Sequence, residues 1–264
     1  MARNLNHYPA NPSYGSGTFR RRFILSREGE RRTVALLDDY HTMSATLTLS
    51  DGVVTDVSAS MERFPKTTCP GAATALEALR GKPVSSHSAL LRGVDRGGHC
   101  THLIDMAGIA LSWPVEDGET RVIEVAVRDK DPEQRQQVQI TVDGISALSL
   151  EMREDAIETP AAHRGRKIFG GYARWVEETF PPQEASLWLI AQMAMFVAVG
   201  RGYIVGGPIA RTTGLEEERK GACFSYSDPS FDIARDNVGY VRDYSGGLPP
   251  PVGAAGKAAQ GILK

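Results

Sequence analysis

The sequence predicts an α+β fold, with an antiparallel β-meander packed against helices and a mainly helical, loop-rich C-terminal part. Apolar and polar residues alternate around two Asp-Gly pairs, at 51–52 and 143–144, as they do in β-hairpins. Apolar residues also recur at helical spacing between the hairpins and after residue 160. This order of strands and helices is too irregular for a doubly wound parallel sheet, and therefore favours the α+β class.

The strands are predicted from alternation with period two. Thr33–Leu37 is one candidate strand, and Ala45–Met61 continues the pattern on both sides of the first Asp-Gly pair. Three more strands are expected in the middle of the chain, and the second Asp-Gly pair joins the last two of them. They are Val122–Val127, Val138–Val142 and Ile145–Met152.

The helices are predicted from apolar spacing and from their end signals. One helix is expected to begin at Cys69-Pro70, because proline suits the first helical position, and to end at Gly81. A looser helical segment follows Pro83, and a longer helix is expected over Thr101–Leu111. Later in the chain we expect helices at Tyr172–Glu178 and Glu184–Val199 and a short strand at Cys223–Tyr226.

Changes in composition suggest three parts. Residues 1–18 form an irregular N-terminal arm rich in Asn, Pro, Gly and Ser, residues 19–158 form an α+β core, and residues 159–264 form a helical and loop-rich part that closes on the core. The second boundary falls in the linker-like segment Glu158–Ala162. The first hairpin and the helices starting at Cys69 and Thr101 are expected to share one compact unit, because each has a single apolar face.

Composition also limits the partners. The formal net charge is −2, which gives no electrostatic support for nucleic-acid binding. The start of the chain lacks the apolar core of a secretory signal, and the most apolar run, Leu187–Val199, is too short to cross a bilayer. Three cysteines do not make a disulfide framework, so we expect a cytoplasmic protein. We expect its partner to be a small-molecule substrate, with no membrane or nucleic-acid partner. A homo-oligomer is compatible with these features.

Six potential ligands or catalytic residues lie where secondary-structure elements are expected to start. Cys69 and Cys100 each stand at the start of a predicted helix, where the helix dipole favours a thiolate. Thiolate, imidazole and carboxylate together suit zinc or iron, although no C-x-x-C pair is present. The six are Asp39, His41, Cys69, His99, Cys100 and His102. A structural role as buried hydrogen-bonding or packing residues remains the alternative for each of them.

The stretch from His41 to Leu111 resembles a bacterial family of domains of unknown function. The family pattern has an Arg, an Asp and a His before a hairpin, a Pro and a Cys after it, L…L-x-G, and a G-C-T-H-L-like motif. The matching residues are Arg32, Asp38 or Asp39, His41, Pro65, Cys69, Leu76, Leu79, Gly81 and His99-Cys100-Thr101-His102-Leu103. The chain departs from the pattern at His99, where glycine is expected. The resemblance implies a shared fold and site, and an association with aromatic-compound catabolism.

The order of parts is also similar, at a greater distance, to the iron–sulfur scaffold proteins of the NifU N-terminal type. That resemblance places the scaffold's second Cys on Cys69, its His-Cys pair on His99-Cys100, and its first Cys and Asp near Asp39 and His41. Because His41 stands where a thiolate is expected, the residues suit a single zinc or iron ion better than a cluster under assembly.

The function expected from these features is that of a small-molecule enzyme. No nucleotide-binding motif is present, so we expect a lyase-type reaction, by proton abstraction and C–C or C–O cleavage, on an aromatic or similar catabolic intermediate. His41 is the expected base or ligand, Cys69 the ligand or nucleophile, and Tyr240 and Tyr244 substrate hydrogen-bond donors. Cys223 is expected to be structural. A metal-binding or iron–sulfur accessory protein is the alternative, and a structural module the third possibility.

The pocket of such an enzyme is expected to be dry and lined by rings of the C-terminal part. Exclusion of water would perturb the pKa values of the His and Cys side chains, which acid–base chemistry requires. The rings expected to line it are Tyr172, Trp175, Trp188, Phe196, Tyr203 and Tyr240.

Overall fold

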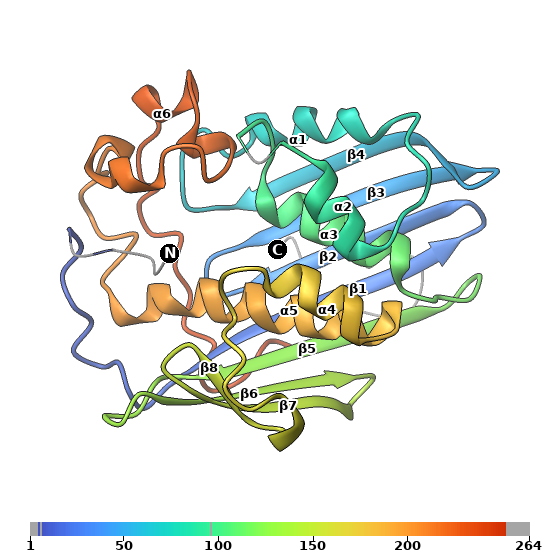
Figure 1. Cartoon of the computed structure of the whole chain (residues 1–264). Coiled ribbons are helices and arrows are strands. Elements are labelled where there is room, and N and C mark those ends of the chain that lie inside the picture. The colour runs from blue at the N-terminus through green and yellow to red at the C-terminus, as the bar shows by residue number, and fades with distance from the viewer. Residues whose placement is uncertain (1–4, 6, 96, 252–264) are drawn as a thin grey trace. The chain divides into compact units, whose positions relative to one another are not determined.

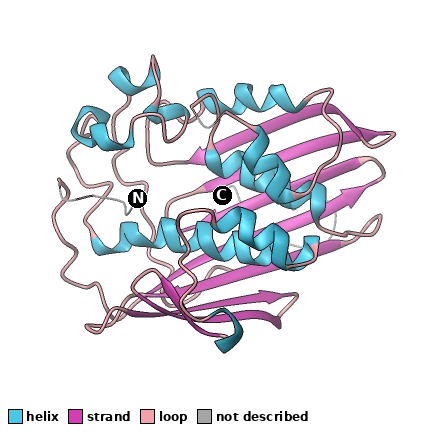
Figure 2. Cartoon of the chain, in the orientation of Figure 1, coloured by secondary structure: helices cyan, strands magenta, loops and turns pink. Residues whose placement is uncertain are grey.

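The computed structural model describes residues 5, 7–95 and 97–251. It has the expected α+β fold, with an antiparallel sheet in the strand order β4-β3-β2-β1-β5-β6-β7-β8 (Figures 1 and 2). The chain divides into two compact units. The first holds the described residues up to Arg22, with Val122–Val205 and Asp243–Leu248, and the second holds Phe23–Arg121, Gly206–Arg242 and the described residues after Leu248.

The strands β1–β4 include the expected first hairpin. Their bounds are β1 (Thr18–Glu28), β2 (Arg31–Asp38), β3 (Thr42–Ser50) and β4 (Val53–Arg63). β2 pairs with β3 and β3 with β4, both antiparallel, with Ala45 opposite Val34 on one side and Ala59 on the other. Asp51 and Gly52 have φ of 49° and 74°, so this Asp-Gly pair makes the left-handed turn that was predicted.

β1 was not predicted from the sequence. Its alternation is hidden by three consecutive arginines, Arg20 to Arg22, although the side chain of Arg21 is fully buried. Arg22 is also buried and pairs with Glu124 at 2.6 Å. From sequence alone, a charged residue in a strand is expected to face solvent unless its partner is known. The partner of Arg22 lies about a hundred positions further along the chain, so it could not be recognised locally.

The helices of the second unit agree closely with the prediction. α1 (Gly71–Ala75) continues into the 3-10 helix η1 (Leu76–Leu79), and α2 (His87–Gly93) and α3 (Thr101–Ser112) follow. The first helix starts two residues later than expected, with Pro70 as its N-cap. α3 packs on β2 and β3 (Figure 1). As expected, the first hairpin and the helices after Cys69 and Cys100 all lie in one unit.

The end of the second unit consists of short helices, η4 (Thr213–Arg219), η5 (Phe224–Tyr226) and α6 (Ser230–Ile233). The strand expected at Cys223–Tyr226 is therefore wrong. The amide of Tyr226 donates to the carbonyl of Cys223 at 2.8 Å, which closes a tight turn. Alternation over four residues predicted a strand, but side-chain contacts of Tyr226 and Ser225 hold the segment in a 3-10 turn.

The first unit has its own strands and helices. They are β5 (Thr120–Arg128), β6 (Arg135–Val142), β7 (Ile145–Arg153), β8 (Ala156–Thr159), η2 (Ala161–His163), α4 (Tyr172–Thr179), α5 (Pro182–Ala198) and η3 (Val199–Gly202). The segment Glu158–Ala162 is not a linker, because β8 pairs with β7 and η2 follows it. The other expected strands and helices are present here, with ends that differ by a few residues.

The aromatic residues of the first unit pack on one another. Trp188 lies 4.7 Å from the Phe180 ring and 5.7 Å from the Trp175 ring, measured between centroids, and is buried. Within the described residues, one helical stretch, Pro182–Gly202, is 21 residues long and apolar enough to cross a membrane, so it is longer than the apolar run predicted to be too short, but 67% of its 18-residue apolar window is buried. This burial is typical of a core helix in a soluble protein.

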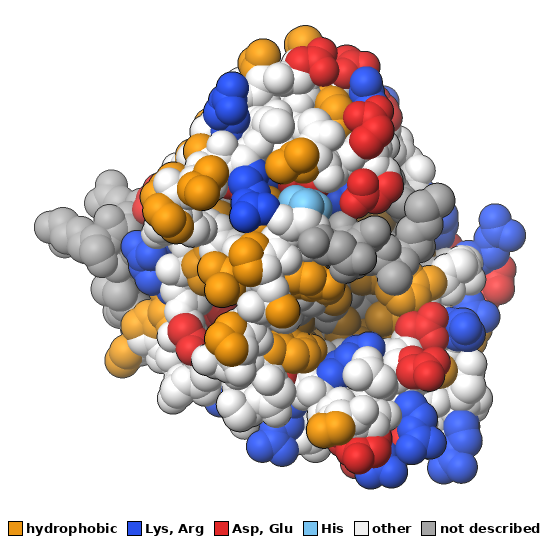
Figure 3. Space-filling view, turned by 90° about the vertical axis from the view of Figure 1, so that its left-hand side faces the viewer, with side chains coloured by type: hydrophobic (Ala, Val, Ile, Leu, Met, Phe, Trp, Pro, Cys, Tyr) orange, Lys and Arg blue, Asp and Glu red, His pale blue; other side chains and the backbone are white. Residues whose placement is uncertain are grey.

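Hydrophobic side chains are also present on the surface, as the face shown in Figure 3 illustrates, where they lie among charged groups. Scattered surface hydrophobic residues are normal and by themselves indicate no partner. The large hydrophobic residues that the structure exposes are Val84, Ile145, Ile204, Ile209, Leu215, Ile233 and Val238.

Candidate functional site

The turn between β2 and β3 fixes an imidazole against a carboxylate. Asp38 is fully buried, and its Oδ1 accepts hydrogen bonds of 2.7 Å from the amides of Tyr40 and His41. The same oxygen lies 3.0 Å from Nδ1 of His41, which is itself only 5% exposed. The carboxylate therefore sets both the shape of the turn and the orientation of the ring, as in carboxylate–histidine pairs of enzymes.

Asp38, rather than the predicted Asp39, is the residue that holds His41. Asp39 is buried beside it, and its backbone carbonyl accepts hydrogen bonds from Arg63 Nη1 and from the amide of Arg242 at 2.8 Å each. Two adjacent aspartates cannot be told apart by residue type. The turn geometry decides, because it is Asp38 Oδ1 that accepts from the amides of Tyr40 and His41.

Arg63, at the end of β4, holds this turn from the other side. Its Nη1 donates to the carbonyls of Asp39 and Tyr240, at 2.8 and 3.0 Å, and its Nη2 donates to the carbonyls of Asp38 and His41, at 2.5 and 2.9 Å. One guanidinium thus joins the turn to a segment that lies 177 residues further along the chain. Arg63 was not predicted as a site residue, because nothing local in the sequence distinguishes it from a surface arginine.

Aromatic rings surround His41. The ring centroid of His102, in the first turn of α3, lies 4.1 Å from that of His41. Tyr40 meets His41 edge-on at 6.4 Å and lies 6.2 Å from Tyr240. Burial raises the pKa of the Tyr240 hydroxyl, and the charges of nearby carboxylates raise it further, so this hydroxyl stays protonated at neutral pH. The structure therefore places Tyr240 at the predicted site.

The three cysteines of the chain are neighbours. The Ser225 hydroxyl donates to Cys69 Sγ at 3.4 Å, and burial raises the pKa of Cys69 to about 11. Burial likewise raises the pKa of Cys100, with further increases from charge on Cys69 and Cys223. Cys223, expected to be only structural, thus belongs to this thiol cluster. In Cys69 and Cys100 burial outweighs the helix-start effect that predicted thiolates, so at neutral pH both side chains are thiols.

The remaining predicted residues divide between the units. The carbonyl of His99 accepts from the amide of Phe224 at 2.9 Å, and its buried Nδ1 has no hydrogen-bond partner among the described residues. His99 and Cys100 are thereby tied to the segment that carries Cys223. Tyr244 lies in the first unit, whereas every contact that defines the site joins residues of the second.

The expected zinc or iron would need several ligands that converge on one point. No three His, Cys, Asp or Glu side chains in the described ranges are arranged to hold a metal ion. The thiols and imidazoles have the right chemistry for a soft metal, but their arrangement does not fit a preformed site.

A buried network of charges adjoins the thiols. Lys66 Nζ donates to Glu216 Oε1 at 2.5 Å and to Asp236 Oδ1 at 2.7 Å, and all three side chains are almost fully buried. Arg219 Nη1 also pairs with Glu216, and Tyr226 donates to the same carboxylate at 2.7 Å. The amide of Cys69 is bonded to the carbonyl of Lys66, so this network fixes the position of the first thiol.

A second buried carboxylate–histidine pair joins two helices. His87 Nε2 at the start of α2 lies 2.8 Å from Asp105 Oδ1 on α3, and both side chains are at most 2% exposed. Neither residue was predicted to have a special role. Their spacing of 18 positions carries no motif, and only the packing of the two helices brings them together.

Gly108 on α3 is where His87 packs closest. A Cβ on this glycine would lie 2.4 Å from His87 Cδ2, and a ring held by Asp105 cannot move away freely. We expect Gly108→Ala to lower the free energy of unfolding by about 1–3 kcal/mol through overpacking. Urea denaturation measures this change. Gly93→Ala is the matched control, because its Cβ would meet open space at the end of α2. Equal stability of both variants would contradict the packing argument.

Comparison with known proteins gives a similarity to one family over part of the chain, and no activity. No curated protein matches the chain. Residues 26–116 match a family model described as a protein of unknown function (DUF2889). The matched range includes Asp38, His41, Cys69, Cys100 and His102, whereas Cys223 and Tyr240 lie outside it. The part of this chain that carries most of the site is therefore similar to a family of unknown function, and the match covers about a third of the chain.

Proposed function

We propose that this protein is a small-molecule enzyme in which His41 acts as the general base of a lyase-type reaction, without a nucleotide cofactor. The observation that carries the proposal is the buried pairing of His41 Nδ1 with Asp38 at 3.0 Å. A carboxylate on one ring nitrogen raises the basicity of the other and stabilises the imidazolium formed when that nitrogen takes a proton. The ring of His102 lies beside it, with centroids 4.1 Å apart and planes tilted by 35°.

The chemistry follows from the groups that face the ring. His41 Nε2 takes a proton from carbon, the C–H electron pair forms a double bond, and the neighbouring C–O or C–C bond breaks with its electrons on the leaving group. The imidazolium then returns the proton to that group, so the charges balance. Tyr240, whose raised pKa keeps it protonated, donates a hydrogen bond to the leaving atom. Tyr40 and His102 offer ring surfaces, which suits an aromatic catabolic intermediate.

Cys69 has a limited part in this proposal. A thiol with a pKa of about 11 is a poor nucleophile at neutral pH, because only a minute fraction of it is ionised. We therefore give Cys69 a role in positioning the wall of the site and leave the proton transfer to His41. Tyr244 remains a proposed substrate contact, and the cytoplasm remains the proposed location.

Proton abstraction can be tested before the natural substrate is known. Small aromatic hydroxy acids and alcohols are incubated with the protein in D2O, and NMR follows both exchange at carbon and product formation. We expect turnover with at least one compound and a loss of roughly a hundredfold in the His41→Gln variant, the typical contribution of a general base. His163→Gln makes the same change in the first unit, where the ring of His163 packs on Trp175, Phe180 and Trp188, and should leave the rate unaltered. Equal rates in parent and His41→Gln, with both folded, would refute His41 as the base.

The thiol cluster favours a second candidate function, the binding of a soft metal ion such as zinc or iron in an accessory role. Three neighbouring cysteines and the buried His99 Nδ1 provide suitable donors, but they must first move closer together. Since each thiol must lose a proton to bind, affinity should rise with pH. Cobalt(II) titration, read as a thiolate charge-transfer band, tests this idea. A band that survives Cys223→Ser and Cys100→Ser, or no band at all, would refute it.

A further inference from the structure

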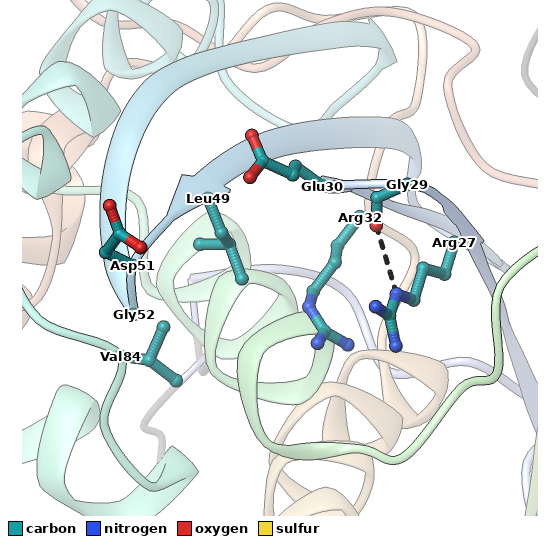
Figure 4. A pocket seen from close by; sticks show the side chains of 8 residues that line it. All are labelled: Arg27, Gly29, Glu30, Arg32, Leu49, Asp51, Gly52 and Val84. Carbon is teal, nitrogen blue, oxygen red and sulfur yellow. Dashed lines mark hydrogen bonds between the residues drawn. The ribbon is translucent and has the colours of Figure 1, made fainter.

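A hollow of about 350 Å³, open to solvent, lies at the hairpin-turn end of the β1–β4 strands (Figure 4). This volume lies within the range of small-molecule sites. The walls come from the turn between β1 and β2, the turn between β3 and β4, and the segment that precedes α2. The residues that matter for its chemistry are Arg27, Glu30, Arg32, Leu49, Asp51 and Val84.

Two guanidinium groups face this hollow. In Figure 4 the side chains of Arg27 and Arg32 extend in the same direction from neighbouring strands. Arg27 Nε donates to the carbonyl of Gly29 at 3.0 Å, whereas Arg32 makes no hydrogen bond or ion pair with any residue in the described ranges. Burial lowers the pKa of Arg32, and the charge of Arg27 lowers it further. Two adjacent cations without a shared counter-ion attract an anion.

The two carboxylates at the rim do not neutralise these arginines. Neither Glu30 nor Asp51 forms an ion pair with Arg27 or Arg32 among the described residues, and Figure 4 shows both carboxylates directed away from the guanidinium groups. The remaining wall is apolar, with Leu49 half-buried and Val84 38% exposed. The hollow therefore combines a cationic side with an apolar side.

Backbone hydrogen bonds hold this frame in place. The amide of Leu49 donates to the carbonyl of Glu30 at 3.0 Å, which links the two turns. The amide of Val84 donates to the carbonyl of Gly52 at 2.8 Å, which fixes the third wall. Since the walls are tied together before any ligand arrives, little ordering is needed on binding, which favours affinity.

We propose that this hollow binds a small organic carboxylate, with its charged group between Arg27 and Arg32 and its apolar body against Leu49 and Val84. A planar carboxylate can accept two hydrogen bonds from a guanidinium, and it relieves the repulsion between the two cations. The site is separate from the proposed catalytic one. Arg32 and Asp38 lie at opposite ends of β2, which is roughly 20 Å at the rise of an extended strand.

The probes for this proposal are benzoate, benzyl alcohol and inorganic phosphate, added separately to the isotope-labelled full chain. Benzoate should cause saturable NMR shifts at the amides of Leu49 and Val84, whereas benzyl alcohol, which lacks the charge, should cause none. Phosphate should bind at least tenfold more weakly than benzoate, because it gains nothing from the apolar wall. Absence of saturable shifts with benzoate, or equal binding of phosphate or the alcohol, would overturn the proposal.

A pair of arginine variants separates the site from general surface charge. Arg32→Gln should weaken benzoate binding at least tenfold, the loss of roughly one charge-assisted hydrogen bond. Arg31→Gln removes the same charge from the exposed neighbouring position and should change the affinity by less than twofold. Equal weakening of benzoate binding in both variants would mean that the effect comes from net charge, and would overturn the proposed binding site. Both variants are expected to fold, because neither side chain is fully buried.

Discussion

Replacing Lys66 with methionine is expected to lower the free energy of unfolding by about 3–5 kcal/mol, the cost typical of breaking a buried ion pair from one side. Lys66 is the cation between Glu216 and Asp236, at 2.5 and 2.7 Å. Methionine has a similar length and apolar stem, so the packing is kept while the charge is lost. Two carboxylates would then remain in a buried place, where Arg219 pairs with Glu216 and Tyr226 donates to the same carboxylate.

The loss should depend on pH in a defined direction. Burial by itself would raise the pKa of Glu216, but Lys66, Arg219 and Tyr226 hold it below the usual value of 4.5. In the parent, ionised Glu216 therefore stabilises the folded state fully above its unfolded-state pKa. This stabilisation is lost as the pH falls through the lower folded-state pKa. Without Lys66, burial raises the folded pKa, so acid protonates Glu216 and the difference between variant and parent shrinks.

Urea denaturation at pH 7 and near pH 4 measures both effects. Lys82→Met is the matched control, since Lys82 is exposed and should change stability by less than about 0.5 kcal/mol. A Lys66→Met variant as stable as this control would show that the charges of the network are solvated or that they rearrange. A loss that grows on acidification would contradict the assigned pKa direction.

Replacing Arg63 with methionine is expected to cost about 3 kcal/mol and to release the turn that carries His41. Hydrogen bonds to charged groups contribute about 1.5–3 kcal/mol each, with strong overlap between bonds of one group. The guanidinium supplies four hydrogen bonds to backbone carbonyls, and they join Asp38–His41 to Tyr240. Methionine supplies none, so these carbonyls lose their shared donor and the two segments can separate.

Two readouts test this prediction. Denaturation gives the free energy, and NMR of the His41 ring reports whether its environment becomes averaged. Arg80→Met is the control, because Arg80 has two ion pairs at the surface, with Asp56 and Glu77, which are expected to contribute less than about 1 kcal/mol. An unchanged His41 signal with lost stability would mean that Arg63 supports the fold but does not hold the site.

The sequence by itself determined the elements whose signals are local. The Asp-Gly turn at 51–52 and the apolar spacing of 101–112 depend on neighbours within one turn or one hairpin, so both elements were predicted with nearly correct ends. The same holds for α5, whose apolar run indicated burial. β1 was not predicted, because the partner of its buried Arg22 lies far away in the sequence.

Only the tertiary structure decided how the site is put together. His41 and Cys69 were chosen from residue type and position, but their partners Asp38, Arg63 and Ser225 depend on turn geometry and on contacts across long sequence separations. Cys223 is the clearest case. As an isolated residue in a short apolar segment it looked structural, and it joins the other cysteines because a 3-10 turn ties residues 223–225 to Cys69 and His99. This packing also buries Cys69, which was expected to be a thiolate. Cys69 is a thiol at neutral pH, because desolvation disfavours the charged form more strongly than the helix start favours it.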